Sequence, residues 1–403
     1  MSTRSSMRIV VTGLAATYPL GGVFWDYVQY ALGFMQMGHE VLYLEDSGKW
    51  CYDPAAETFV ESGARNAEWF AAQLHRFDER LAARWFFRDP LGQTWGLEWP
   101  KVVEFCRTAE VFVHVSFSCR MRDEYCAARK LVFIDSDPMF TQASIPQYLA
   151  GRLTPEDPDG QRVATMLRHQ VHFTFGENIA GADCRVPRAH LNWLPTRQPI
   201  VLECFRDSRL APPQRRRVLT TVMSWESADR GPIIDGVEYG AKSREFVRFI
   251  DLPGRSPLPL EIAISGKAPR AELTARGWRL VEAPQACGDP WSYRDYLARS
   301  YGEWSIAKNA YVQSRSGWFS CRSACYLALG VPVIVQDTGF GCAVPTGRGV
   351  MAFATPDQAQ AAIESVAGDP QRHSAAALEI ADQYFAAARV LGTLLDRALS
   401  TSS

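Results

Sequence analysis

The sequence predicts an α/β protein built from two series of alternating strands and helices. Short apolar runs with β-branched residues recur along the chain, each too short for a helix and typical of an interior parallel strand. Amphipathic segments of helical period lie between them. A segment rich in proline and arginine, 211–217 (APPQRRR), separates the two series. The chain therefore predicts two α/β domains with a boundary near residue 212.

Length, composition and charge limit the class of protein further. The 403 residues are enough for two domains with sizeable cores, and 47% of them are hydrophobic. The net charge of −1 gives no basic field that would point to nucleic acid. No apolar run approaches a membrane span or a signal peptide, so we expect a cytoplasmic protein whose fold begins near Met7 after a disordered lead-in, 1–6. Ten scattered cysteines predict buried thiols in a reducing compartment.

The first series opens with a βαβ unit. The pattern predicts a strand at 8–11, a helix at 24–38 and a second strand at 41–44. Gly21 and Gly22, at the start of the helix, either face a phosphate or form a plain βα loop. The G-x-G-x-x-G fingerprint is absent, so an NAD-linked dehydrogenase ranks below the other hypotheses, although Glu45 and Asp46 follow the second strand.

The rest of the first series carries three candidate groups. Helices are expected over 55–107, with a break near 89–92, and their tryptophans either line an acceptor pocket or pack in the core: Trp85, Trp95 and Trp99. His114 lies inside a predicted strand at 111–115, where a histidine is more often a satisfied core group. The strand at 131–134 runs into Asp135 and Asp137. Paired acids at this end of a sheet suit a general base, for which Asp137 is preferred; an Asx turn or a metal-binding D-x-D are the alternatives.

The second series begins after the boundary. Strands are predicted at 218–223, 260–264 and 278–281, with helices at 242–250, 293–300, near 358–366, and a long last helix at 375–399. Trp225 stands at the end of the first of these strands. Lys308 and Arg315 either hold a diphosphate or are surface charges, and Lys242 is a weaker phosphate candidate.

The most specific stretch is 315–341, RSGWFSCRSACYLALGVPVIVQDTGFG. It predicts a glycine turn, a short helix, a tight turn at Gly330, a buried strand at 331–335 and a second glycine turn. A helix N-terminus binds phosphate through its free N–H groups and its dipole. The residues that would serve such a ligand lie before the helix, on it and in the loop after the strand: Ser316, Gly317, Ser320, Arg322, Ser323, Asp337, Thr338 and Gly339. Ser320 or Ser323 is expected to cap the helix.

A small-residue helix ending in Gly-Val-Pro-Val-Ile and followed by Asp-x-Gly resembles the nucleotide-sugar-binding segment of GT-B glycosyltransferases. In that family the helix holds the donor diphosphate and the loop after the next strand faces the sugar. The chain departs from the pattern at one place. Many members carry a glutamate five residues before the glycine, where this chain has Cys325, so the resemblance implies an altered way of holding the donor.

The resemblance implies two Rossmann-like domains facing a central cleft. Residues 1–212 would form the acceptor side together with a last helix, about 380–403, that crosses back to them; residues 213–379 would bind the nucleotide sugar. It also implies that Gly21 and Gly22 face the cleft, that 281–284 (with Pro284) contacts the nucleobase, and that Asp26 or His114 joins Asp137 as a candidate base.

The sequence thus favours a bacterial-type hexosyltransferase that moves a sugar from a nucleotide-diphosphate sugar to a small-molecule or glycan acceptor, such as a natural product. Neither a metal nor a cofactor is expected, and the protein would be a monomer or homodimer without a nucleic-acid partner. Two alternatives stay open. One is a nucleotide-sugar epimerase of the same fold, which would need no acceptor. The other is a catalytically silent binding protein, which the cysteine at position 325 favours.

Overall fold

A computed structural model of the chain describes residues 6–225 and 231–401. Within these residues the first half of the chain forms an eight-stranded sheet in which every neighbouring pair is parallel except β5 and β6. In sheet order its strands are β10 (Trp193–Pro195), β9 (Val171–Thr174), β8 (Leu131–Asp135), β7 (Val111–Val115), β1 (Arg8–Thr12), β2 (Glu40–Glu45), β5 (Trp85–Arg88) and β6 (Thr94–Gly96).

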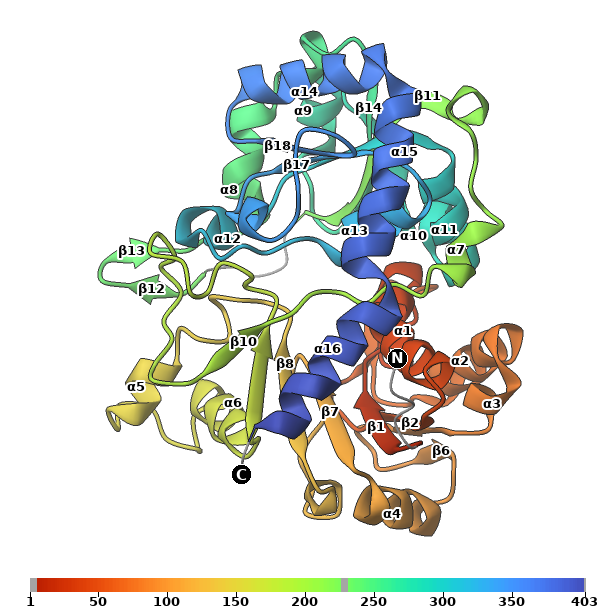
Figure 1. Ribbon diagram of the computed structural model, residues 1–403, viewed down its shortest axis with the longest axis vertical. Helices are drawn as coiled ribbons and strands as arrows, with labels where there is room; N and C mark the ends of the chain where they lie inside the picture. The colour runs from red at the N-terminus through yellow and green to blue at the C-terminus, as the bar shows by residue number, and fades with distance from the viewer. Residues whose placement is uncertain (1–5, 226–230, 402–403) are drawn as a thin grey trace.

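The second half forms a parallel sheet, six-stranded in the described residues. In sheet order its strands are β15 (Arg279–Glu282), β14 (Leu260–Ser265), β11 (Arg216–Ser224), β16 (Ser300–Ser305), β17 (Val333–Gln336) and β18 (Val350–Phe353). Two small hairpins lie outside the sheets: β3 (Cys51–Asp53) with β4 (Thr58–Val60), and β12 (Ile233–Ile234) with β13 (Val237–Glu238). Figure 1 shows the first-half sheet below and the second-half sheet above.

Helices connect the parallel strands in both halves. Those of the first half are α1 (Gly21–Gln36), α2 (Ala64–Phe77), α3 (Glu79–Ala82), α4 (Trp99–Thr108), α5 (Ile145–Leu149), α6 (Pro158–Leu167) and α7 (Glu203–Arg206). Those of the second half are α8 (Lys242–Phe246), α9 (Arg270–Ala275), α10 (Ala283–Cys287), α11 (Pro290–Ala298), α12 (Asn309–Ser314), α13 (Cys321–Ala328), α14 (Pro356–Gly368), α15 (Pro370–Ile380) and α16 (Ala387–Ser400). No helix of the described residues is long and apolar enough to cross a bilayer.

The last helix returns to the first half, as the resemblance implied (Figure 1). The expected single helix is interrupted. A π-helical turn, Ala381–Phe385, follows α15, and Ala386 leaves the helical conformation before α16 begins. α16 then packs so tightly on α1 that a Cβ on Gly33 would lie 2.6 Å from the Leu391 side chain. Close packing of this kind ties the two ends of the chain together.

The predicted linker is ordered. A short 3₁₀ turn, Pro212–Gln214, leads straight into β11, and the buried Arg215 donates to the Leu210 carbonyl at 2.7 Å and to Ser374 Oγ at 3.2 Å. The strands of the two sheets fall on either side of this segment. The domain limits at 212 and 379 themselves stay a prediction.

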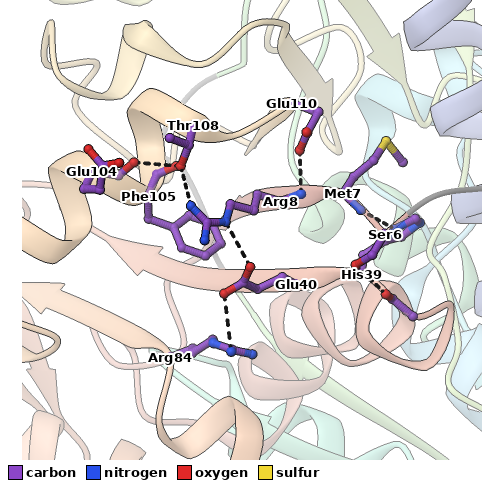
Figure 2. A network of polar contacts seen from close by, with 11 residues as sticks. Ser6, Met7, Arg8, His39, Glu40, Arg84, Glu104, Phe105, Thr108 and Glu110 are labelled. Carbon is purple, nitrogen blue, oxygen red and sulfur yellow. Dashed lines mark hydrogen bonds and ion pairs between the residues drawn. The ribbon is translucent and has the colours of Figure 1, made fainter.

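A polar network fixes the amino end of β1 (Figure 2). Arg8 donates from Nε to Glu40 on β2 at 2.9 Å and from Nη1 to Thr108 at the end of α4 at 2.8 Å, while its N–H donates to Glu110 at 2.6 Å. Glu40 also pairs with Arg84 at 3.3 Å. Just before the strand, Ser6 donates to the Gly38 carbonyl at 2.9 Å; the remainder of the predicted lead-in, 1–5, lies outside the described residues. The network sets the register of β1 and β2 at the edge opposite the strands' carboxyl ends.

Several strands were not expected from the sequence. β5 and β6 lie within 55–107, where only helices were predicted, and so does part of the β3–β4 hairpin. Trp85 and Trp95 accordingly pack in the first-half core, and Trp99 packs against Phe86 and Tyr125, so none of the three lines the cavity described below. The ten cysteines are all free, and several are buried, as predicted.

Candidate functional site

A cavity of about 440 Å³ lies between the carboxyl ends of the second-half strands and the amino end of α1. Open α/β sheets bind ligands at this edge, because the loops there are free to shape a site. The second half contributes most of the wall, including strand ends of β11 and β14, α10, Tyr293 and the start of α13. The first half contributes Leu20, Gly22, Val23, Asp26, Tyr52, Ser136 and Asp137.

Three cations of the described residues line the cavity: Lys242 on α8, Lys308 before α12 and Arg322 on α13. Within the described residues Lys242 has no ion-pair partner. Burial, together with the charges of Arg322 and Lys308, lowers its pKa to about 7, with Glu303 opposing. Cations gathered this closely repel one another, so the cavity is matched to an anion.

Arg322 is held in place by the second sheet. Its Nε donates to Glu303 on β16 at 2.6 Å, Nη1 to the Val222 carbonyl at 2.7 Å and Nη2 to Ser305 Oγ at 2.5 Å. Glu303 is fully buried, and its second oxygen, Oε2, has no hydrogen-bond partner in the described part of the chain. The guanidinium therefore reaches the cavity from a fixed position. Sequence reasoning selected Arg322 and missed Glu303.

The amino end of α13 opens onto the cavity. Ser320 occupies the N-cap position and lines the cavity, but its hydroxyl makes no capping bond, in contrast to the prediction. In the described chain the N–H groups of the first turn, at Cys321, Arg322 and Ser323, have no backbone acceptor. Helix N-terminal N–H groups of this kind are the usual ligands of phosphate oxygens. Ser323 does not line this cavity. Its Oγ is buried beside a separate small cavity and has no hydrogen-bond partner among the described residues.

Of the two acids among the described residues that line the cavity, Asp26 is the one that makes no ion pair with a described cation. It lies on α1, about one helical turn after Gly22 and Val23, and is partly buried. Burial raises the pKa of its carboxyl to about 7, against the opposing effects of the Arg322 charge and a hydrogen bond from the Cys321 thiol. A carboxylate with a pKa near neutrality suits a general base.

Asp137, the preferred base in the sequence analysis, also lines the cavity but is occupied. Lys308 Nζ donates to both of its oxygens, at 3.0 and 2.9 Å, and the Tyr311 hydroxyl donates to Oδ1. This ion pair joins the end of β8 to the second half across the cleft. Its neighbour Asp135 is fully buried and accepts from Thr141, Gln142 and Thr174, so that it shapes the turn.

His114 does not reach the cavity. It is fully buried in β7, and its Nε2 accepts from the Cys119 N–H at 3.2 Å while Nδ1 meets His169 Nε2 at 3.2 Å. Burial, with the nearby His169, lowers its pKa well below the ordinary value. The geometry gives His114 a structural place in the core and contradicts its candidacy as a base.

The predicted glycines serve close packing of the protein. A Cβ on Gly21 would lie 2.3 Å from the Asp289 carbonyl oxygen, and one on Gly22 would lie 3.2 Å from the Tyr293 ring. Gly317, with a φ of +82°, would place a Cβ 2.2 Å from the Asn178 nitrogen. Gly22 still lines the cavity, whereas Gly21 and Gly317 do not. These positions require glycine because other segments of the protein approach them closely.

The other residues predicted in the 315–341 stretch to hold a ligand do not line the cavity, although Trp318 and Cys321 do. Arg315 pairs with Asp183 at 2.5 Å and with Asp337 at 3.3 Å on a different face. Thr338 donates to the Trp318 carbonyl at 2.6 Å, and Gly339 forms a turn with a φ of +94°. Ser316 is buried, with its carbonyl accepting from Asn178 at 3.1 Å. These contacts contradict a direct role in holding a ligand in this cavity.

Three further predictions have mixed outcomes. Pro284 lines the cavity together with Ala283 and Cys287, while its contact with a nucleobase stays a prediction. Trp225 does not line it and packs on Phe246 at 4.9 Å in the second-half core. Cys325 is buried against Gln29 of α1, whose Nε2 lies 3.9 Å from its Sγ, so it takes no part in the cavity wall.

No group of three or more His, Cys, Asp or Glu side chains in the described residues is arranged to hold a metal ion. The two D-x-D acids, Asp135 and Asp137, are engaged with hydroxyls, an amide and Lys308.

Solved glycosyltransferase structures share this architecture. An α-glucosyltransferase in complex with UDP and a 13-mer DNA aligns with a TM-score of 0.58 at 10% identity, over 98% of this chain and 100% of that chain. HepE of Anabaena in complex with UDP aligns with a TM-score of 0.54 at 13% identity, over 98% and 100%. AviGT4, a glycosyltransferase involved in avilamycin A biosynthesis, aligns with a TM-score of 0.51 at 13% identity, over 98% and 97%. No family model matches the sequence, and no curated protein is significantly similar to it.

The chain therefore has the GT-B glycosyltransferase fold, as the 315–341 stretch indicated. At these identities the likeness concerns the fold alone, and the activity must be argued from the site.

Proposed function

We propose that this protein is a glycosyltransferase that moves a hexosyl group from a nucleotide-diphosphate sugar to a hydroxyl of a small-molecule or glycan acceptor, without a metal ion. The observation that carries the proposal is the grouping of Lys242, Lys308, Arg322 and the open N-terminus of α13 on one wall of the cavity. This wall offers fixed positive charge and N–H donors to a diphosphate, in the place that a metal ion would otherwise take.

In this proposal the two halves have different roles. Residues 213–379 hold the donor, with the nucleobase toward Pro284 and the diphosphate on α13. Residues 1–212 with the last helix present the acceptor beside Asp26. The similar structures of an α-glucosyltransferase and HepE were determined with UDP, which supports a nucleotide donor at this fold's cleft.

The reaction needs one proton acceptor and one stabilised leaving group. Asp26 takes the proton of the acceptor hydroxyl as its oxygen bonds to the anomeric carbon. The bond from that carbon to the diphosphate oxygen breaks, and the cations hold the charge that develops there. This assignment of Asp26 belongs to a reaction that inverts the anomeric centre.

A ligand screen tests donor binding directly. The melting temperature is measured with UDP, GDP, dTDP, ADP, their sugar conjugates and NAD(H), because a ligand of the folded state raises it. We expect a shift with one nucleotide diphosphate that is reduced in Lys242→Met and Ser320→Ala and kept in Lys101→Ala, a surface cation on α4 that controls for net charge. Silence with every nucleotide, or a shift with NAD(H) alone, would contradict the proposal.

Arg322→Ala is the wrong probe for this test. It leaves the fully buried Glu303 without its partner, and an uncompensated buried charge costs about 3–5 kcal/mol of stability. A lost shift in that variant would report unfolding as readily as lost binding.

Asp26→Asn tests the base. We expect transfer to fall by about 10²–10⁴-fold while the affinity for the nucleotide stays within a factor of about two. In the parent protein the rate should rise through pH 7, since the carboxyl must be ionised to accept a proton. Turnover of the sugar nucleotide with no acceptor would favour the epimerase instead.

A further inference from the structure

The walls of the cavity differ in charge, and this difference bears on the acceptor. Among the described residues, the cations that line it come from the second half: Lys242, Lys308 and Arg322. The first-half wall has two acids, Asp26 and the Lys308-paired Asp137, and is otherwise largely apolar: Leu20, Val23 and Tyr52. On the first-half wall an anionic acceptor would lie beside the carboxyl group of Asp26 and would meet no cation of the described residues to balance its charge.

An aromatic surface continues from this apolar wall. Tyr52 lies in the β3–β4 hairpin directly opposite Phe59, and their ring centroids are 5.4 Å apart. Cross-strand partners project on one face of a hairpin. Tyr18, in the loop before α1, meets Phe59 edge-on at 6.2 Å. The group of Tyr18, Tyr52 and Phe59, hereafter the aromatic shelf, thus runs from the cavity wall to the surface.

The shelf is exposed at its outer end. Phe59 is 52% exposed, and Trp50, just before the hairpin, is 53% exposed. Exposed aromatic side chains that adjoin a ligand cavity are more informative than scattered ones, because their apolar faces are available to a ligand.

The backbone beneath the shelf is held rigidly. The Tyr52 N–H donates to the Thr17 carbonyl at 2.9 Å, and the buried Asn66 donates from Nδ2 to the Tyr52 and Ala16 carbonyls at 3.0 and 2.9 Å. Buried Glu45 accepts from the Ala16 and Thr17 N–H groups at 2.8 and 2.9 Å. A platform fixed in this way loses little conformational freedom when a ligand stacks on it.

We propose that the aromatic shelf binds the acceptor, and that the acceptor is an uncharged molecule with a planar apolar ring system and a free hydroxyl. The inference rests on the proposed function and narrows its acceptor from any small molecule or glycan to this class. The ring system stacks on Tyr52 and Phe59, and its hydroxyl points along the Leu20–Val23 wall toward Asp26. Asp26 receives the hydroxyl proton, the hydroxyl oxygen bonds to the anomeric carbon, and the nucleoside diphosphate leaves toward the cations.

The test is a fluorescence titration with 4-methylumbelliferone, a planar phenol, in the presence and absence of UDP, with maltotriose as the competing glycan. We expect the phenol to bind and maltotriose not to displace it. Tyr52→Ala and Phe59→Ala should each raise its Kd by about fivefold or more, the effect of losing one aromatic contact. Leu399→Ala, which removes an exposed apolar side chain at the far end of α16, should leave the Kd unchanged.

The outcomes separate this inference from the function on which it rests. Because Phe59 is half exposed, Phe59→Ala should keep the parent's melting temperature, and so it remains informative if Tyr52→Ala does not fold. Absence of phenol binding, displacement by maltotriose, or an unchanged Kd in Phe59→Ala would overturn the inference. A rise in melting temperature with UDP but no phenol binding would leave the donor proposal standing. Phenol binding to the shelf with no change in melting temperature for any nucleotide would support the shelf and contradict the proposed glycosyltransferase activity.

Discussion

At the scale of single residues, Lys242 shows how the site is prepared for its ligand. It is a partly buried amine that shares one cavity with two other cations and has a pKa of about 7, far below the ordinary 10.5. A diphosphate beside it would favour the charged amine and raise that pKa again. Binding of the donor is therefore coupled to uptake of a proton.

This coupling gives a measurable prediction. At pH 8 the free Lys242 is mainly neutral, while a nucleotide diphosphate is already ionised, since phosphate's second pKa is about 6. We expect binding to take up close to one proton there, and the affinity to fall as the pH rises above 7. Calorimetry in two buffers of different ionisation enthalpy measures the uptake. Lys242→Met should abolish it; equal uptake in the variant and the parent would assign the proton to another group.

Some residues of the candidate site could be predicted from the sequence, and others could not. Lys242, Lys308, Ser320 and Arg322 could be selected because cations and small polar residues around a helix start are a recognisable pattern. Glu303 could not, because nothing in Ser-Tyr-Gly-Glu-Trp-Ser shows that its carboxylate is buried under Arg322. Partners that meet only in the fold leave no local signal.

At the scale of elements, a chain of buried histidines joins β7 to the loop after α6. His114 Nδ1 meets His169 Nε2 at 3.2 Å, and His169 Nδ1 lies 3.0 Å from the Met166 carbonyl. Because His114 Nε2 accepts from an N–H, its Nδ1 carries the proton, and the chain is complete only with neutral rings. Burial lowers the pKa of His169 to about 4.

The sign of the pH effect follows from these pKa values. The unfolded chain binds protons at His169 below about pH 6.5, whereas the folded protein does so only near 4. The free energy of unfolding should thus be unaffected by this group above pH 6.5 and fall by about 3 kcal/mol between pH 6.5 and 4. Urea unfolding across pH 4–8 measures this slope. His169→Gln should make this slope shallower, with the buried His114 keeping its own contribution of the same sign, and the exposed His75→Gln should leave the slope unchanged; the same slope in all three proteins would contradict the assignment.

Strands could be predicted where the sequence has a run of apolar residues or an apolar–polar alternation, and they were missed where it has neither. Val111–Val115 and Leu131–Asp135 are apolar runs buried on both faces, and both were recognised. β16 was missed because its buried positions hold Ser300, Glu303 and Ser305, whose burial depends on partners from α13 and β11. The β3–β4 hairpin was missed because Phe59 and Thr58 are exposed, so no alternation marks it.

At the scale of the whole molecule, contacts between distant segments decide how the halves meet. Gly317 and Gly339 pack against Asn178, which donates to the Arg315 carbonyl at 2.9 Å. The α16 helix closes the other side on α1. The two-sheet plan could be predicted from alternation alone, whereas the partner of each glycine could not, because it lies more than a hundred residues away.

The ion pair of Asp137 with Lys308 is a contact between the halves that lies inside the cavity itself. It places a carboxylate next to a cation that the donor diphosphate would also use. Two like charges a few ångströms apart near a protein surface repel by a few kcal/mol, so Asp137 and a bound diphosphate oppose each other there. The ligand must therefore compete with Asp137 for Lys308, and part of its binding energy goes into replacing a contact that already joins the halves.

We expect Asp137→Asn to bind the nucleotide more tightly, by about two- to tenfold, because the competing charge is gone while the amide oxygen can still accept from Lys308. The same variant without ligand should have weaker contact between the halves, seen as a larger radius of gyration in solution scattering that returns to the parent value on adding nucleotide. Raising the salt concentration should narrow the difference in affinity, since the competition is electrostatic. Weaker nucleotide binding by Asp137→Asn would show instead that the carboxylate itself contacts the donor, as an acceptor for a sugar hydroxyl, and that the pair with Lys308 belongs to the ligand-free protein alone.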